Sequence, residues 1–183
     1  KRGISAVSLL FAALGALAFV SAGRAWIFPT LGWIAAAACI QTRLLCNLLD
    51  GMVAIEGGKR SPTGAVWNEV PDRFADMLFL VGAGIGCGQP WAGVAAAWAA
   101  AMTAYVRSIG AELTGKHDFC GPFAKPHRMA VLTGAALLTP LEFLWNGNPP
   151  LLPLVLWIIA GGTMFTAFRR LVRLAKQLKS PQP

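Results

Sequence analysis

Six apolar segments, each of bilayer-spanning length, constrain the fold of this chain more than any other feature. They cover residues 4–22, 31–55, 64–87, 90–112, 128–146 and 151–171. A helix needs roughly 20 residues to cross the hydrocarbon core of a membrane. The sequence therefore predicts an all-α, polytopic membrane protein with six transmembrane helices.

The composition excludes an ordinary soluble domain. Of the 183 residues, 56% are hydrophobic and only 13% are charged, and the mean hydropathy is +0.57. The connections are short and no repeat is visible, so we expect a single domain over residues 1–183. The chain begins with Lys1, and we expect its first apolar segment to be a retained span. Six tryptophans lie near segment ends, where interfacial aromatics are expected: Trp26, Trp33, Trp67, Trp91, Trp145 and Trp157.

The net charge of +8 does not indicate a nucleic-acid partner, because the cations gather in alternate loops. One side of the predicted membrane holds both basic termini and the loops around Lys59 and Lys116, whereas the other side offers only Arg24. By the positive-inside rule, both termini and the loop after the second segment are cytoplasmic. We therefore expect a multi-pass protein of the cytoplasmic membrane, whose basic tail rests on anionic headgroups.

Oxygen-bearing side chains occur at helical spacing inside the second and third segments. Asn47 and Asp50 share one helix face, and Asn68, Glu69, Asp72 and Asp76 lie on or beside a face of the next helix. These helices are antiparallel neighbours, so Asp50 and Asp72 are expected at similar depth beneath the cytoplasmic surface. All six side chains are candidate ligands for Mg²⁺ or Mn²⁺, which prefer oxygen.

This pattern resembles the signature of the CDP-alcohol phosphotransferase family, D-x2-D-G-x2-A-R-x8-G-x3-D-x3-D. It appears here as Asn47, Asp50, Gly51, Ala54, Ile55, Gly64, Asn68 and Asp72. The spacing is kept throughout, but Asn47 and Asn68 replace aspartates and Ile55 replaces an arginine. In an alternative alignment the acids have moved by one turn, so that Asp72 and Asp76 take the last two positions.

The resemblance implies a metal-dependent phosphatidyltransferase. It would move a phosphatidyl group from CDP-diacylglycerol to a small polar alcohol and release CMP, with two Mg²⁺ or Mn²⁺ ions and with Asp72 as the catalytic base. Gly51, Ala54, Gly64 and Asp50 would bind the nucleotide. Among the family's activities, phosphatidylglycerophosphate synthase-like activity is favoured, at an active site on the cytoplasmic side. Runs of alanine in the helices suggest a homodimer.

A second, basic cluster lies in the later segments. Arg107 is near the end of the fourth segment, and Lys125 and Arg128 are near the start of the fifth. Cations that converge on one pocket suit a phosphorylated acceptor such as glycerol phosphate or inositol phosphate.

Other interpretations of these residues remain. Asp76 lies one turn deeper than Asp72, so a buried ion pair with Arg43 is favoured over metal ligation. An ion transporter is a second functional class, although the acids gather at one membrane face and not at the midplane. A non-catalytic relative that still binds nucleotide or metal is a third, because Asn47, Ile55 and Asn68 depart from the signature.

Overall fold

The computed structural model describes residues 2–26, 28–56, 64–115, 118–145 and 150–179, and in these residues the chain forms helices without strands. The helices are α1 (Arg2–Gly23), α2 (Pro29–Glu56), α3 (Gly64–Gly86), α4 (Pro90–Thr114), α5 (Lys125–Trp145) and α6 (Leu151–Lys179). The all-α, six-helix prediction is confirmed for this part of the chain. The side chains of residues 2–5, 50, 51, 53–56, 64, 65, 67, 68 and 145 lie outside the description.

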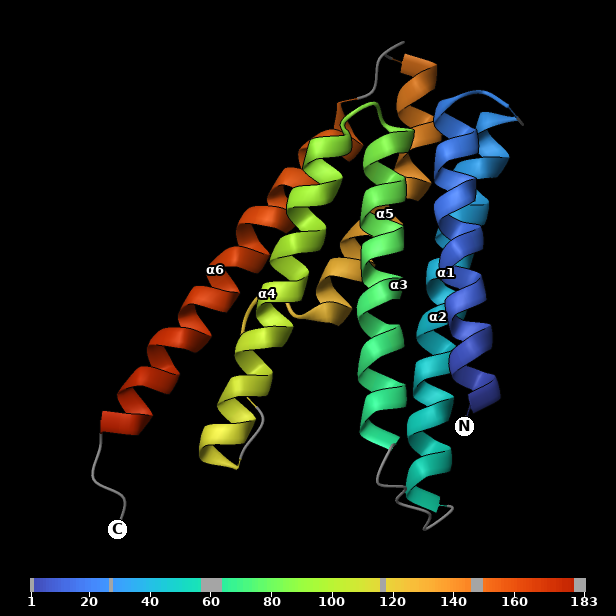
Figure 1. Cartoon of the computed structure of the whole chain (residues 1–183). Helices are drawn as coiled ribbons and strands as arrows, with labels where there is room; N and C mark the ends of the chain where they lie inside the picture. Colours follow the sequence, from blue (N-terminus) through green and yellow to red (C-terminus); the bar gives the residue numbers. More distant parts are fainter. Residues whose placement is uncertain (1, 27, 57–63, 116–117, 146–149, 180–183) are drawn as a thin grey trace.

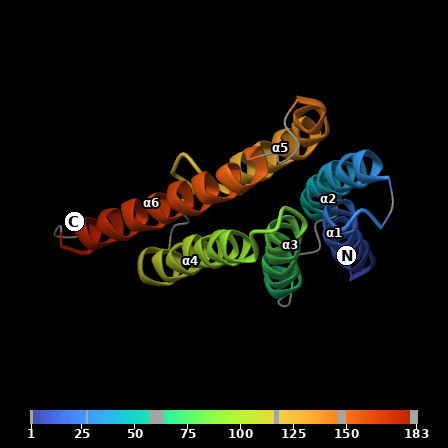
Figure 2. The ribbon, with the colours of Figure 1, turned by 90° about the horizontal axis from the view of Figure 1, so that it is seen from above.

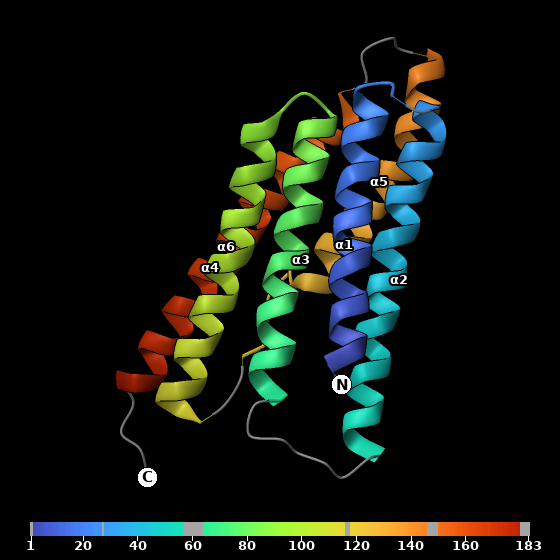
Figure 3. The ribbon, with the colours of Figure 1, turned by 45° about the vertical axis from the view of Figure 1, so that its right-hand side comes forward.

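The helices form two groups that meet at α3. Helix α1 packs against both α2 and α3, and α4 runs along α6 (Figures 1 and 2). Helix α3 also contacts α4, and α5 joins the two groups by packing against α2 and α6. The start of α1, the end of α2, the start of α3 and the end of α6 lie at one end of the bundle (Figures 1 and 3). This is the arrangement expected of an even number of antiparallel spans.

Three helices meet a simple length and hydropathy criterion for crossing a membrane by themselves. These windows are Ala6–Gly23, Pro29–Leu49 and Leu151–Lys179, with mean hydropathies of 2.1, 1.3 and 1.9. Helices α3, α4 and α5 run beside them in the same bundle (Figure 3) but do not meet this criterion over their described residues. They carry most of the candidate site residues. Charges in such helices face the protein interior and lower the mean hydropathy.

Helix α5 starts inside the bundle and not at its end (Figures 1 and 3). The segment 118–124 leads to it and packs on α6, where the backbone N–H of Phe123 donates to Oγ1 of Thr166 at 3.3 Å. A Cβ atom at Gly162 would lie 2.7 Å from Cε2 of Phe123, so the missing side chain makes room for this ring. The segment thus reaches the interior, where its carbonyl groups become available to side chains of the site.

Trp33 is a correction to the expected interfacial tryptophans. It is 1% exposed and packs edge-on against Phe19 of α1, with ring centroids 5.9 Å apart. Trp33 was expected at the interface because it lies near the end of an apolar segment. In the structure α1 covers the face of α2 on which Trp33 lies. Trp26, Trp91 and Trp157 are exposed, as interfacial or lipid-facing residues would be.

Small residues let α3 approach its neighbours closely. A Cβ atom at Gly84 would lie 2.7 Å from Cα of Gly93 in α4, and one at Gly82 would lie 2.7 Å from Cα of Ala16 in α1. Backbone contact of this kind is a common basis of helix association in membranes. It places α3 at the centre of the bundle.

We predict that Gly84→Val destabilises the protein by about 2 kcal/mol, because the added atoms must push α3 and α4 apart. The measurement is the thermal unfolding midpoint of the purified protein in detergent. Gly134→Val in α5 is the matched control, since nothing lies within 4 Å of a Cβ atom there. Equal midpoints for the two variants would contradict the close-approach argument.

Candidate active site

Asp72 lies between two cationic side chains from two other helices. Its Oδ1 accepts a hydrogen bond from Nη2 of Arg43 in α2, and its Oδ2 accepts one from Nζ of Lys125 at the start of α5. The Asp72 side chain is 16% exposed, and that of Arg43 is 2% exposed. Both oxygens of the carboxylate therefore bind positive charge, in charge-assisted contacts of the strong kind.

Asp76, one turn deeper in α3, forms the most buried ion pair of the site. Its Oδ2 lies 3.0 Å from Nη2 of Arg128, and the two side chains are only 3% and 2% exposed. Asp76 is thus ion-paired as expected, but the predicted partner, Arg43, is wrong. Helix α5 packs against α2 and brings Arg128 to Asp76, while the long Arg43 side chain reaches Asp72 instead.

Glu69 faces α4. Its two carboxylate oxygens lie 2.6 and 2.5 Å from Nη2 of Arg107, and Oε2 also lies 3.1 Å from Nη2 of Arg73. The guanidinium of Arg107 in turn lies over the ring of Phe119, 5.3 Å from its centroid. Glu69 therefore positions Arg107, and its role as a metal ligand stays a prediction.

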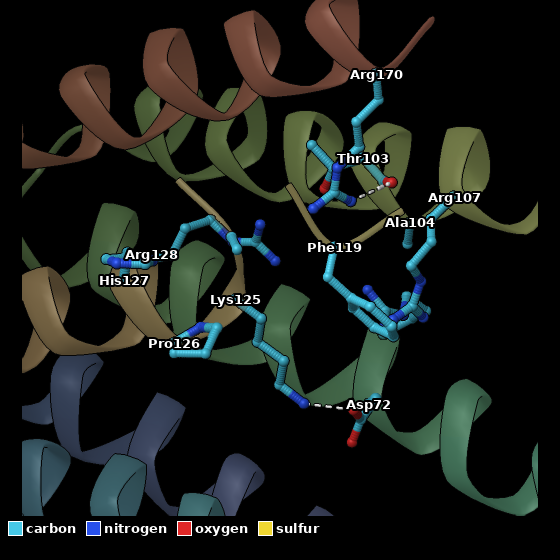
Figure 4. A pocket seen from close by; sticks show the side chains of 12 residues that line it. Asp72, Thr103, Ala104, Arg107, Phe119, Lys125, Pro126, His127, Arg128 and Arg170 are labelled. Carbon is cyan, nitrogen blue, oxygen red and sulfur yellow. Dashed lines mark hydrogen bonds and ion pairs between the residues drawn. The ribbon is translucent and has the colours of Figure 1, made fainter. Parts of the chain in front are cut away.

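A cavity of about 440 Å³ opens beside Asp72, between α3, α4, α6 and the segment that leads into α5 (Figure 4). Asp72 is the one carboxylate among the described residues that line it. The basic residues on its wall are Arg73, Arg107, Lys125, His127, Arg128 and Arg170. The structure thus brings together all three residues predicted to bind an acceptor phosphate, Arg107, Lys125 and Arg128.

Arg170 of α6 is a site residue that the sequence analysis missed. It is 6% exposed, and it donates to the carbonyl oxygens of Cys120 at 2.8 Å and Thr103 at 3.3 Å. Within the described part of the chain, no carboxylate oxygen lies within ion-pair distance of it. Its place among the arginines and lysines near the C-terminus had suggested a basic tail on the membrane surface. Helical spacing from Thr163, Thr166 and Ala167 could have indicated its buried face.

The remaining predicted residues lie near the end of α2 and the start of α3. Asn47 is half-buried on α2, one turn from Arg43. The residues Asp50, Gly51, Ala54, Gly64 and Asn68 lie in α2 or α3, but their side chains are outside the described part. Among the side chains that are described, no three His, Cys, Asp or Glu residues gather as a metal cluster. The facing of Asp50 and Asp72 therefore stays a prediction.

Comparisons with known proteins agree with the motif. No protein-family profile matches the chain. The phosphatidylinositol phosphate synthase of Mycobacterium bovis is 29% identical over 188 residues, covering 93% of this chain and 81% of that protein. The enzyme of the same name from Mycobacterium marinum is 29% identical over 161 residues, covering 82% of this chain and 66% of that protein.

Solved structures give the same fold. The crystal structure of Mycobacterium tuberculosis phosphatidylinositol phosphate synthase with CDP-DAG bound has a TM-score of 0.76 at 19% identity, covering all of this chain and 90% of that one. The same enzyme in complex with manganese and citrate also gives 0.76 at 19% identity, and 86% of that chain is covered.

The six-helix bundle therefore has the fold of these synthases, and its pocket holds acidic and basic side chains. The chain is a divergent relative of the phosphatidylinositol phosphate synthases, which are CDP-alcohol phosphotransferases.

We predict that Asp76→Asn lowers the free energy of unfolding by about 3 kcal/mol or more, because it leaves the buried Arg128 without its counter-charge. Thermal unfolding in detergent measures the loss. The control is Arg73→Gln, which removes a partly exposed ion pair and should cost below about 1 kcal/mol. The affinity for Mn²⁺ of folded Asp76→Asn protein should match that of the parent. A large loss of affinity would instead make Asp76 a ligand.

Proposed function

We propose that this protein transfers a phosphatidyl group from CDP-diacylglycerol to a small phosphorylated alcohol and releases CMP. The observation that carries the proposal is the position of Asp72. This last acid of the signature lies on the wall of a cavity whose other described charged side chains are basic and come from α3, α4, α5 and α6.

The chemistry of the cavity supports an anionic acceptor. Arg107 and Arg128 are already ion-paired, but Arg170 is held only by carbonyl oxygens among its described contacts and keeps its full positive charge. A guanidinium can bind phosphate with two parallel hydrogen bonds. Glycerol phosphate and inositol phosphate both carry a phosphate group that could bind in this way. The sequence favoured the first, and the names of the relatives favour the second.

In the proposed reaction, Asp72 accepts the proton of the attacking hydroxyl group. The alcohol oxygen forms a bond to the lipid-linked phosphorus of CDP-diacylglycerol, and the bond from that phosphorus to CMP breaks. The cavity walls hold the phosphate of the acceptor, so that its hydroxyl is presented to Asp72 at high effective concentration. We place the nucleotide near Gly51, Ala54, Gly64 and Asp50, at the cytoplasmic ends of α2 and α3.

The oxygen donors of the signature fit a hard divalent cation in kind. Asp72 is an anionic oxygen donor, but Arg43 and Lys125 occupy its two oxygens in this structure, and a metal ion would have to displace one of them. Mg²⁺ or Mn²⁺, held by Asp72 with Asp50, Asn47 and Asn68, would neutralise the diphosphate and the departing CMP. We omit Glu69 and Asp76 from this set because arginines bind their oxygens.

We further propose that the site opens to the cytoplasm and that the chain forms a homodimer. The end of the bundle with the α2–α3 hairpin carries most of the lysines and arginines, which supports the orientation. The alanine runs that suggested a dimer pack within the chain, as Ala37 and Ala97 do. The apolar face of α4 at Val94 and Trp98 remains exposed and supports association, which cross-linking in native membranes tests.

A non-catalytic relative is the second candidate, and Asn47, Ile55 and Asn68 are the observations that favour it. Two amides in place of carboxylates reduce the negative charge available to a cation. Such a protein would bind Mn²⁺ or CDP-diacylglycerol without turnover.

The test is incubation with CDP-diacylglycerol, Mg²⁺ or Mn²⁺, and a panel of acceptors that includes glycerol phosphate and inositol phosphate. CMP release and a new phospholipid, identified by mass spectrometry, are expected with one of them, and a chelator should abolish both. Asp72→Asn should lower the rate by a factor of about 10² to 10⁴, the range for loss of a general base. The exposed Glu112→Gln variant is the control. Substrate binding without turnover would favour the second candidate.

We also predict that Arg170→Gln raises KM for the phosphorylated acceptor about tenfold, with a smaller effect on kcat, because one charge-assisted contact to the phosphate is lost. Its neighbour Arg169 is exposed on α6, so Arg169→Gln is the matched control. An unchanged KM in the Arg170 variant would remove this residue from the acceptor site.

A further inference from the structure

Phe119 carries the one phenyl ring among the described residues that line the cavity. It is 65% exposed, on a wall that is otherwise rich in cations. A ring in this position adds nothing to the core, and it favours a ligand that covers it, because covering removes apolar surface from water. The cations of the cavity can hold the phosphate of an acceptor, which leaves the carbon skeleton of the acceptor to other parts of the wall.

The backbone beside Phe119 is held by hydrogen bonds. The N–H of Cys120 donates to Oδ1 of Asp118 at 2.8 Å, and the carbonyl oxygen of Cys120 accepts a hydrogen bond from Nε of Arg170, also at 2.8 Å. Oδ2 of Asp118 lies 3.9 Å from Nη1 of Arg173, which like Arg170 belongs to α6. Phe119 therefore projects from backbone that its own segment and α6 anchor together.

Arg107 covers part of the ring. Its guanidinium carbon lies 5.3 Å from the ring centroid, within the range of a cation–π contact. The oxygens of Glu69 lie 2.6 and 2.5 Å from Nη2 of Arg107 and orient the guanidinium. Figure 4 shows Phe119 and Arg107 meeting at one wall of the cavity. The ring and the guanidinium thus form one continuous surface, on which most of the ring stays accessible.

A surface of this kind discriminates between carbon skeletons by their shape. A cyclic polyol such as inositol directs most of its hydroxyl groups outward around its ring and presents C–H groups on its faces, so that a face can lie against a phenyl ring. A short linear polyol such as glycerol has no such face and leaves the phenyl ring in contact with water. Burial of apolar surface therefore favours the cyclic acceptor.

We propose that Phe119, positioned by Arg107, selects acceptors whose carbon skeleton is a ring. One face of the cyclic polyol packs on the phenyl ring while its phosphate binds the cations of the same cavity. Phe119 is thus a specificity-determining residue for the acceptor and takes no part in the bonds that form and break. This inference rests on the proposed phosphatidyl transfer and extends it to the choice of acceptor.

The experiment measures initial rates of CMP release from CDP-diacylglycerol with Mg²⁺, over a range of concentrations of inositol phosphate or of glycerol phosphate. Phe119→Ala should raise KM for inositol phosphate about five- to tenfold, the loss expected when roughly 50 Å² of apolar surface is no longer buried. Its kcat, and its KM for glycerol phosphate, should stay within about twofold of the parent values. Phe119→Tyr keeps the ring and should match the parent. Phe168→Ala is the matched control, since Phe168 is 63% exposed on α6 and does not line the cavity.

Equilibrium binding gives a second readout that does not require turnover. In titration calorimetry without CDP-diacylglycerol, the parent should bind inositol phosphate more tightly than glycerol phosphate, and Phe119→Ala should lose most of this difference. The inference is overturned if Phe119→Ala weakens both acceptors equally, since the ring would then serve only to position Arg107. It is also overturned if neither acceptor is affected, as for an aromatic residue that only contacts the membrane surface.

The two proposals fail in different ways. A parent protein that binds inositol phosphate with the expected preference but releases no CMP would refute the proposed function and leave the role of Phe119 supported. Transfer to either acceptor without any effect of Phe119→Ala would refute the role of Phe119 and leave the proposed function standing.

Discussion

The pairing of the α3 carboxylates with cations from neighbouring helices is the constraint on which the rest of the structure depends. Glu69 pairs with α4, Asp72 with α2 and α5, and Asp76 with α5. Ionised side chains at membrane depth are expensive unless they are paired or face a hydrated cavity. These contacts therefore restrict the rotation of α3 and the depth at which three other helices pack against it.

Close packing and charge pairing act together on α3. Its later half meets α1 and α4 through glycines, where backbones nearly touch. Its earlier half reaches α2, α4 and α5 through ion pairs of long charged side chains. Long side chains bridge helices that are farther apart, so the half of the bundle that holds the α3 carboxylates leaves room for the cavity beside Asp72. Helix α3 thus packs closely against its neighbours along one half and lines the site along the other.

Backbone carbonyl groups give the cavity its electrostatic character. The segment 118–124 enters the bundle before α5 begins, and its carbonyls at Cys120 and Phe123 accept hydrogen bonds from Arg170 and Arg128. A carbonyl oxygen satisfies a donor but does not cancel a unit charge. Arg170 in particular has no carboxylate within ion-pair distance among the described residues, although Asp118 lies close enough to interact with its charge, and a pocket built in this way is suited to anions. Gly121 of this segment and Gly162 of α6 leave the room in which the segment packs against α6.

The sequence by itself determined the helices, because apolar length and helical period are local properties of the chain; the single domain and the oxygen-bearing faces of α2 and α3 stay predictions from the same local patterns. It also selected Arg107, Lys125 and Arg128 for one pocket. The tertiary structure alone decided which charges meet: Asp76 pairs with Arg128 and not with Arg43, and Arg170 leaves the basic tail for the interior. Periodicity fixes the face of a helix on which a residue lies, but the rotation and depth of one helix against another depend on packing among all six.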